Sequence, residues 1–210
     1  MGQGTEERIL SATVEVASIH GLGRLSVADV AKRAGLSRPT VYKHFATKDA
    51  LVAAAVWRET AATVEAVTTT MAGIADPGEA LAAGVVVALR RAREHPLLDR
   101  VVRTEPERLV PLLTSDDPRV LSVARAPVEA IIGDRLPSLD TMTRRRLADM
   151  IVRLLVSWSL SAPDDPPEVV ASVVASLLLD GARSVAGSGA AVAVTFPVAT
   201  APHPDPGRDH

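Results

Sequence analysis

The clearest repeat of apolar and polar positions in the 210-residue chain lies between residues 26 and 48. Ser26 stands before this repeat in the position of an N-cap, and Gly35 follows it where a left-handed backbone ends a helix. Between them, apolar residues recur at i, i+3, i+4 and i+7, the spacing of one helix face: Val27, Val30, Ala31 and Ala34. The pattern predicts a short amphipathic helix that ends in a tight turn.

A second short helix is predicted directly after the turn, at residues 37–45. Ser37 can cap this helix, and Pro39 falls in its first turn, where the missing N–H of proline breaks no hydrogen bond. The order of helix, turn and helix predicts a helix-turn-helix motif at about residues 26–45, with residues 37–45 as the recognition helix.

The outward face of the second helix follows from its own residues. If Val41 and Phe45 face the core, a rotation of about 100° per residue turns Lys43 away from it. The side chains on the outward face and its flanks are Arg38, Pro39, Thr40, Tyr42, Lys43 and His44. Most carry groups that hydrogen-bond to base edges or phosphates, so we expect this face to contact DNA.

Helical periods continue through most of the remaining chain and predict an all-α fold. The expected helices span residues 5–20, 48–71, 79–94, 97–103, 118–136, 141–161 and 166–186. Pro127 marks a candidate kink or break in the helix at 118–136. Residues 191–196 have the composition of a short extended piece, but the sequence offers it no partner strand.

We divide the chain into a DNA-binding domain at residues 1–50, a larger helical domain at 51–186, and a tail at 187–210. The helix at 48–71 joins the first two, and a turn at 75–78 marks where the later helices begin. The tail is rich in Gly, Ala and Pro and has no helical period, so it is predicted to be mostly disordered.

The stretch GLSRPTVYKHFATKDAL resembles the signature of TetR-type (tetracycline-repressor-like) transcriptional regulators, with similarity from about Glu6 to Leu51. The resemblance implies phosphate contacts by Tyr42, His44 and Lys48. It implies base contacts by the residues between the serine and the tyrosine: Arg38, Pro39 and Thr40. Lys43 stays open between the two roles, and Ser26 and Ser37 complete the candidate DNA-binding set.

The similarity has one departure, in the first helix. Ala17 stands where the family commonly has an aromatic residue. We expect Ile19 to fill part of that volume, so the departure concerns packing rather than function.

The helices at 141–161 and 166–186 are more apolar than one core face requires. One interpretation is a helix buried deeply in a single core. The other, which the resemblance implies and which we favour, pairs both helices with their copies in a second subunit, because a helix-turn-helix usually binds two half-sites as a dimer. The candidate interface residues are Leu147, Met150, Ile151, Leu154, Val170, Val173, Val174, Leu177 and Gly181.

Composition narrows the chemistry. Apolar residues make up 47 % of the chain and aromatic residues only 2 %, so the core must consist mainly of aliphatic side chains. The absence of cysteine excludes disulfides, thiolate nucleophiles and cysteine-based zinc sites. Residues 1–60 hold 8 Lys and Arg against 6 Asp and Glu, whereas residues 61–210 hold 15 against 19. The basic excess therefore lies with the motif, as expected for a DNA-binding head.

The resemblance also implies an effector pocket among the helices after residue 79. Candidates by position alone are Val86, Leu89, Arg90, Val123, Arg125, Leu154 and Trp158. Because the chain has so few aromatic residues, an aliphatic cavity is expected rather than a stacking site.

These observations, with the family resemblance, predict a cytoplasmic homodimeric regulator that binds a palindromic DNA operator as an effector-responsive repressor. No catalytic motif, cofactor signature, metal-ligand spacing or membrane-length apolar run is present in the sequence, so neither an enzyme nor a membrane protein is expected. The alternative is a helical small-molecule-binding or enzymatic protein whose N-terminal motif is structural. A non-specific architectural DNA binder is disfavoured, because the basic excess of the head is small.

Overall fold

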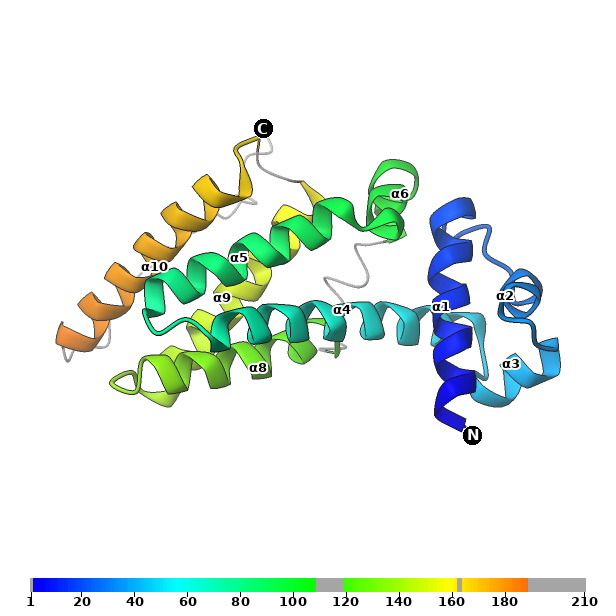
Figure 1. The fold of residues 1–210 in the computed structure, drawn as a ribbon, viewed down its shortest axis with the longest axis horizontal. Helices are drawn as coiled ribbons and strands as arrows, with labels where there is room; N and C mark the ends of the chain where they lie inside the picture. The colour runs from blue at the N-terminus through cyan, green and yellow to red at the C-terminus, as the bar shows by residue number, and fades with distance from the viewer. Residues whose placement is uncertain (1, 109–118, 162–163, 189–210) are drawn as a thin grey trace, which may run out of the picture.

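The computed structural model describes residues 2–108, 119–161 and 164–188, and these residues form helices joined by short turns, with no strand among them. The predicted all-α fold is confirmed. Three helices form a head at one end of the molecule, and a long helix connects the head to a helical body at the other end (Figure 1).

The head consists of α1 (Gly2–His20), α2 (Val27–Ala34) and α3 (Arg38–His44). The predicted caps are present: the side chain of Ser26 accepts a hydrogen bond from Asp29 N, and Gly35 ends α2 with φ +64°. The apolar face of α2 is buried against α1. Two body residues also belong to this core, Leu97 (7 % exposed) and Val101 (2 % exposed), so the packing unit of the head extends beyond residue 50.

The connecting helix is α4 (Lys48–Ala72), which Thr47 caps by accepting a hydrogen bond from Ala50 N at 3.0 Å. The chain then turns back through α5 (Pro77–Glu94), whose N-cap Asp76 accepts hydrogen bonds from Gly78 N and Glu79 N. The two helices approach closely at Gly84, where a Cβ atom would lie 2.8 Å from the sulfur of Met71.

The body continues with α6 (Pro96–Thr104), a short 3-10 turn η1 (Pro106–Arg108), α8 (Arg119–Arg135), α9 (Thr141–Leu160) and α10 (Pro167–Ser188). Helix α8 packs against α4 and α9, and α10 packs against α5. Asp140 caps α9, and the hydrogen bonds that it accepts, the Thr143 hydroxyl first, lower the pKa of its carboxyl group. Two aliphatic clusters lie between these helices, one around Ile132 and Ile151 and one around Val85 and Leu89.

Three local expectations are corrected. Of the two outcomes expected at Pro127, a break is wrong, because α8 continues through this residue, whereas a kink stays a prediction. Helix α10 reaches Ser188, so the first two residues assigned to the tail are helical, and the rest of the tail lies outside the described residues. Ile19 is 61 % exposed and cannot fill the volume beside the buried Ala17, because two residues along a helix turn a side chain by about 200°.

Candidate nucleic-acid interface

Helix α3 is anchored to the head by its inner face. Val41 is fully buried and Phe45, the residue that ends the helix, is 9 % exposed, as the sequence predicts. At the other end, Ser37 Oγ accepts a hydrogen bond from Thr40 N at 3.2 Å and lies 2.8 Å from the hydroxyl of Thr40. The orientation of the helix is therefore fixed at both ends.

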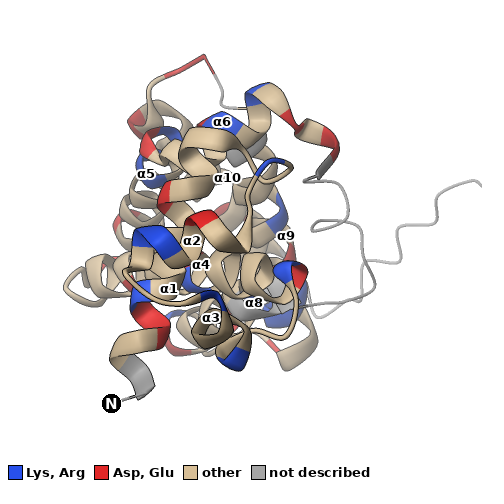
Figure 2. Ribbon diagram, turned by 90° about the vertical axis from the view of Figure 1, so that its right-hand side faces the viewer, with Lys and Arg blue, Asp and Glu red and all other residues tan. Residues whose placement is uncertain are grey.

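The opposite face of α3 is open to solvent. Arg38, Pro39, Tyr42 and Lys43 are exposed, and His44 is half-buried. Figure 2 looks onto this end of the molecule and shows basic positions around α2 and α3 interspersed with acidic ones. The exposed face carries donors on a rigid support, and its contacts with DNA remain a prediction.

The serines of the candidate set have structural partners. Ser26 Oγ accepts from Asp29 N at 3.1 Å and donates to a carboxylate oxygen of Asp29 at 2.5 Å. Ser37 plays the same capping role for α3. Both hydroxyls shape the motif in the free protein.

The turn between α2 and α3 is held by a residue that the sequence did not single out. Leu36 N donates to Ala31 O at 2.9 Å across the turn, while Arg8 Nη2 donates from α1 to Ala34 O at 2.6 Å. Arg8 thereby satisfies a carbonyl group at the end of α2 that has no helical partner. A second contact joins the same two helices, between Arg33 and Glu15.

Lys48 begins α4 and lies beside the head. Its Nζ donates to Gly23 O at 3.1 Å, and Gly23 N donates to Glu105 Oε2 at 2.7 Å. Glu105 follows α6 and is 82 residues away from Gly23 in sequence, so no local pattern could have identified it. The candidate phosphate contact of Lys48 remains a prediction.

A polar network joins α1, α4 and the start of α6. His95 accepts a hydrogen bond from Leu98 N at 3.3 Å through Nδ1, so its Nε2 carries the proton that is shared with Glu59 Oε2 at 3.1 Å. Arg58 contacts Glu59 and also donates to Glu7 Oε1 at 2.7 Å. Partial burial alone would raise the pKa of Glu59, but the hydrogen bonds from Arg58 and His95 outweigh it and lower the pKa.

The candidate effector residues do not converge on one site. Val86, Leu89 and Trp158 pack with the cluster between α5 and α10. Arg90 is on the surface and contacts Glu168, whose pKa is lowered by its own backbone N–H first and by Arg90 second. The remaining candidates are Arg125, which lies 3.9 Å from Asp149; Leu154, which is half-buried; and Val123, whose side chain lies outside the described residues.

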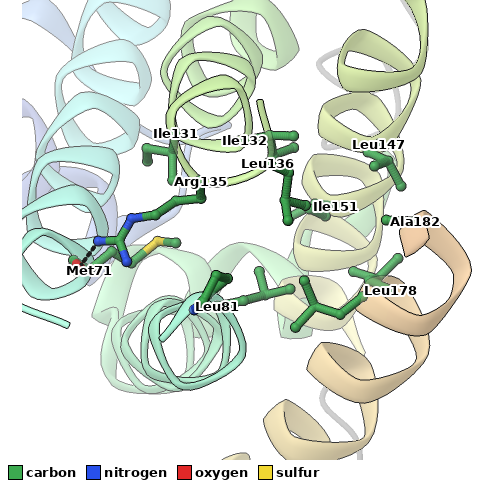
Figure 3. A pocket seen from close by; sticks show the side chains of 12 residues that line it. Met71, Leu81, Ile131, Ile132, Arg135, Leu136, Leu147, Ile151, Leu178 and Ala182 are labelled. Carbon is green, nitrogen blue, oxygen red and sulfur yellow. Dashed lines mark hydrogen bonds between the residues drawn. The ribbon is translucent and has the colours of Figure 1, made fainter. Parts of the chain in front are cut away.

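A small cavity of about 40 Å³ lies instead at the end of the body far from the head. Its lining comes from α4, α5, α8, α9 and α10 and is almost entirely apolar (Figure 3). Arg135 is the exception, but its guanidinium donates to Met71 O at 2.6 Å and to Ile74 O, carbonyl groups at the end of α4. The cavity therefore presents aliphatic surface, with its one cation already bonded.

The structure divides the candidate dimer residues into two groups. Met150 (51 % exposed), Val173 (54 %) and Leu177 (69 %) point outward, and Gly181 is also exposed. Val174, Leu154 and Leu147 are half-buried. Ile151 and Val170 are buried in the core of their own chain, so they offer little surface to a partner, and the dimer face remains a prediction. A helix that is apolar on two sides does not show which side its own chain covers.

The described residues contain no group of three or more His, Cys, Asp and Glu side chains that could hold a metal ion. Within the same part of the chain, no helix combines the length and the apolarity that a membrane crossing requires.

Comparison with known proteins gives consistent matches for both halves. The family model for bacterial regulatory proteins of the tetR family matches residues 9–55, and the model for the C-terminal domain of the bacterial tetracyclin repressor matches residues 76–179. The HTH-type transcriptional regulator Rv1255c of Mycobacterium tuberculosis is 27 % identical over 72 % of each chain.

Two solved structures share the fold. The TetR family repressor AlkX of Dietzia sp. strain DQ12-45-1b, implicated in the biodegradation of n-alkanes, has a TM-score of 0.71 and 22 % identity, over 86 % of this chain and 96 % of its own. The regulator FadR of Bacillus subtilis, solved in complex with stearoyl-CoA, has a TM-score of 0.60 and 20 % identity, over 83 % of this chain and 98 % of its own.

Proposed function

The chain belongs to the TetR family of bacterial regulatory proteins and is a DNA-binding transcriptional regulator, and we propose that it represses by binding a palindromic operator as a homodimer. The observation that supports this proposal is the packing of α3: its inner residues Val41 and Phe45 are buried, and its polar face is exposed. The rival interpretation, an enzyme or ligand-binding protein with a structural N-terminal motif, is not favoured. We propose no catalytic activity, and a cytoplasmic location follows from the need to reach DNA.

We propose that Arg38, Pro39 and Thr40 contact base edges, while Tyr42, His44 and Lys48 position the head on phosphates. The test is operator binding at several salt concentrations, with a duplex recovered from genomic fragments by the wild-type protein. Thr40→Ala should relax sequence preference. Lys48→Ala should weaken binding to all sequences and reduce the salt slope by about one.

The matched control for Lys48→Ala is Arg145→Ala, which removes one exposed positive charge from α9, away from the head. The control should leave both affinity and slope almost unchanged. Equal, salt-independent losses for Thr40→Ala and Lys48→Ala would contradict the division of roles.

We propose that the exposed apolar residues Met150 of α9 and Val173 and Leu177 of α10 form the centre of the dimer interface. Leu177 is 69 % exposed, and its apolar surface is removed from water only if a partner covers it. Leu177→Asp should therefore give a monomer by light scattering and weaken operator binding. Ala130→Asp, an equally charged change at an exposed position on α8, should remain dimeric.

We propose that the effector has an aliphatic part that enters the cavity at Leu81, Ile132 and Ile151. The cavity is far smaller than the roughly 150 Å³ that holds benzene, so the ligand must spread its walls. The compounds associated with AlkX and FadR, n-alkanes and stearoyl-CoA, both contain long aliphatic chains.

The aliphatic ligand is tested by thermal unfolding and operator release with n-hexadecane, stearoyl-CoA and free coenzyme A. The aliphatic compounds should raise the melting temperature and release DNA, and coenzyme A alone should do neither. Ala182→Leu fills the cavity and should abolish both effects. Persistence of both effects in that variant would place the ligand elsewhere.

A further inference from the structure

Glu105 reaches from the end of α6 into the loop between α1 and α2. Its Oε2 accepts a hydrogen bond from Gly23 N at 2.7 Å. Its Oε1 lies only 2.1 Å from the place where a Cβ atom on Gly21 would be. Gly21 also has φ +81°, a conformation that favours glycine. The loop thus receives the carboxylate with a donor at Gly23 and with space at Gly21.

The position of Glu105 is set by α6, which is part of the packing of the head. Glu105 N donates to Val101 O at 2.8 Å and closes the last turn of α6. Val101 and Leu97 are buried in the head core. At the other end of α6, His95 accepts from Leu98 N and contacts Glu59 of α4. Since both ends of α6 are held by these contacts, a shift of α6 relative to the head would move the carboxylate of Glu105 with it.

Gly23 connects this carboxylate to a candidate DNA contact. The N–H of Gly23 binds Glu105, and its carbonyl group accepts from Lys48 Nζ at 3.1 Å. Lys48 has three N–H donors, so it keeps donors for a phosphate while one of them is bound to Gly23. The position of the Gly23 carbonyl group therefore determines where the ammonium group of Lys48 lies before DNA binds.

We propose that Glu105 is a positioning residue for operator binding, which acts through Gly23 on Lys48 and so joins the regulatory half to the phosphate contact. The proposal rests on the proposed function and on the phosphate contact of Lys48. It assigns a role in DNA binding to a residue that lies outside the helix-turn-helix and carries the wrong charge for DNA.

The negative charge of Glu105 allows a positioning role to be separated from a direct electrostatic effect on DNA. Removal of a negative charge near DNA should by itself strengthen binding, because repulsion of phosphates is reduced. Loss of the positioning contact should weaken binding. Glu105→Gln and Glu107→Gln change the net charge equally, but Glu107 is exposed on η1. Only the positioning role predicts opposite effects for the two variants.

The experiment measures dissociation constants for the full-length protein and the recovered operator duplex in a double-mutant cycle. Glu105→Gln should weaken binding by about three- to tenfold. This is less than the full loss of a hydrogen bond to a charged group, because the amide oxygen of glutamine can still accept a weaker hydrogen bond from Gly23 N. Glu107→Gln should leave binding unchanged or tighter. In a Lys48→Gln background, Glu105→Gln should change affinity by less than about twofold, because residues that act through one another are not additive.

Two further measurements separate positioning from loss of structure. The salt slope should fall by about one for Lys48→Gln but not for Glu105→Gln, since Glu105 touches no phosphate. Hydrogen exchange of the Gly23 amide should accelerate in Glu105→Gln, while the melting temperature stays within a few degrees.

The failures are distinguishable. If the wild-type protein retains no specific duplex, the proposed function fails, and this inference fails with it. If the wild-type protein binds and Glu105→Gln behaves as Glu107→Gln does, only the inference is overturned. An equal loss from Glu105→Gln in both Lys48 backgrounds also overturns it, since Glu105 would then act by another route.

Discussion

The core of the head includes two side chains of α6, Leu97 and Val101. The substitution Val101→Ala tests how far the stability of the head depends on them. Val101 is 2 % exposed and belongs to the same cluster as the apolar faces of α1 and α2. The substitution removes two carbon groups, at about 0.8 kcal/mol each, and leaves a cavity behind. We expect the free energy of unfolding to fall by about 2 kcal/mol, which lowers the melting temperature by roughly 4–8 °C in a chain of this size.

The matched control is Val102→Ala, the same change at the next position of the same helix. Val102 is only half-buried, so it should lose less than about 1 kcal/mol. Any gain in helix propensity is the same for both variants. Thermal and urea unfolding at fixed protein concentration measure the difference, and native-state hydrogen exchange locates it.

Val101→Ala should reduce protection in α1 and α2, although the substitution lies 50 residues beyond the DNA-binding domain as the sequence divides it. Equal losses for the two variants would refute the reasoning. So would a loss of protection that is confined to the body.

Three other predictions follow from single contacts. Gly35→Ala places a Cβ atom at φ +64° and 3.3 Å from Arg8 and should cost about 1 kcal/mol or more, whereas Gly73→Ala, at φ −82° with open space around it, should cost nothing in urea unfolding. Because the pKa of Glu59 is lowered from 4.5, its stabilisation is complete above pH 4.5 and is lost as the pH falls through the lower folded value. The stability deficit of Glu59→Gln in urea unfolding should therefore stay constant above pH 4.5 and shrink as the pH falls below 4.5. Arg135→Met leaves the carbonyl groups at the end of α4 without their donors and should cost about 2 kcal/mol in thermal unfolding; a neutral result would show that water replaces the guanidinium.

The sequence predicts those features whose causes are local. The caps Ser26 and Ser37 each accept a hydrogen bond from the backbone N–H three residues on, so their roles can be recognised from neighbouring positions. The burial of Val41 and Phe45 follows from a helical repeat of four residues. The helices of the body were likewise predicted to within a few residues at each end, because periodicity and proline positions are also local signals.

Features that depend on distant segments could not be predicted from the sequence. Arg8 and Glu105 are single polar residues with no periodic context, and their partners lie 26 and 82 residues away. The sequence places Ile151 and Val170 on the predicted dimer face because both sides of α9 and α10 are apolar, and only the packing of the chain shows that it buries these two residues itself. The cavity beside Arg135 could not be anticipated for the same reason, since five separate helices form its wall.

The proposed regulation involves two helices: α4, which lines the cavity, and α6, which is followed by Glu105. The cavity touches Met71 at one end of α4, and Lys48 begins the other end, so a ligand that spreads the cavity is proposed to act along this one helix on the proposed phosphate contact of Lys48. Helix α6 is fixed to the head by Val101 and Glu105 and does not line the cavity. Movement of α4 relative to α6 would strain the contact between Glu59 and His95 and the contacts at Gly23, where Lys48 of α4 and Glu105 after α6 meet. A ligand can shift this equilibrium only by as much as it favours the strained arrangement, so Glu105→Gln, which weakens the contact, should also reduce the ligand concentration needed for operator release.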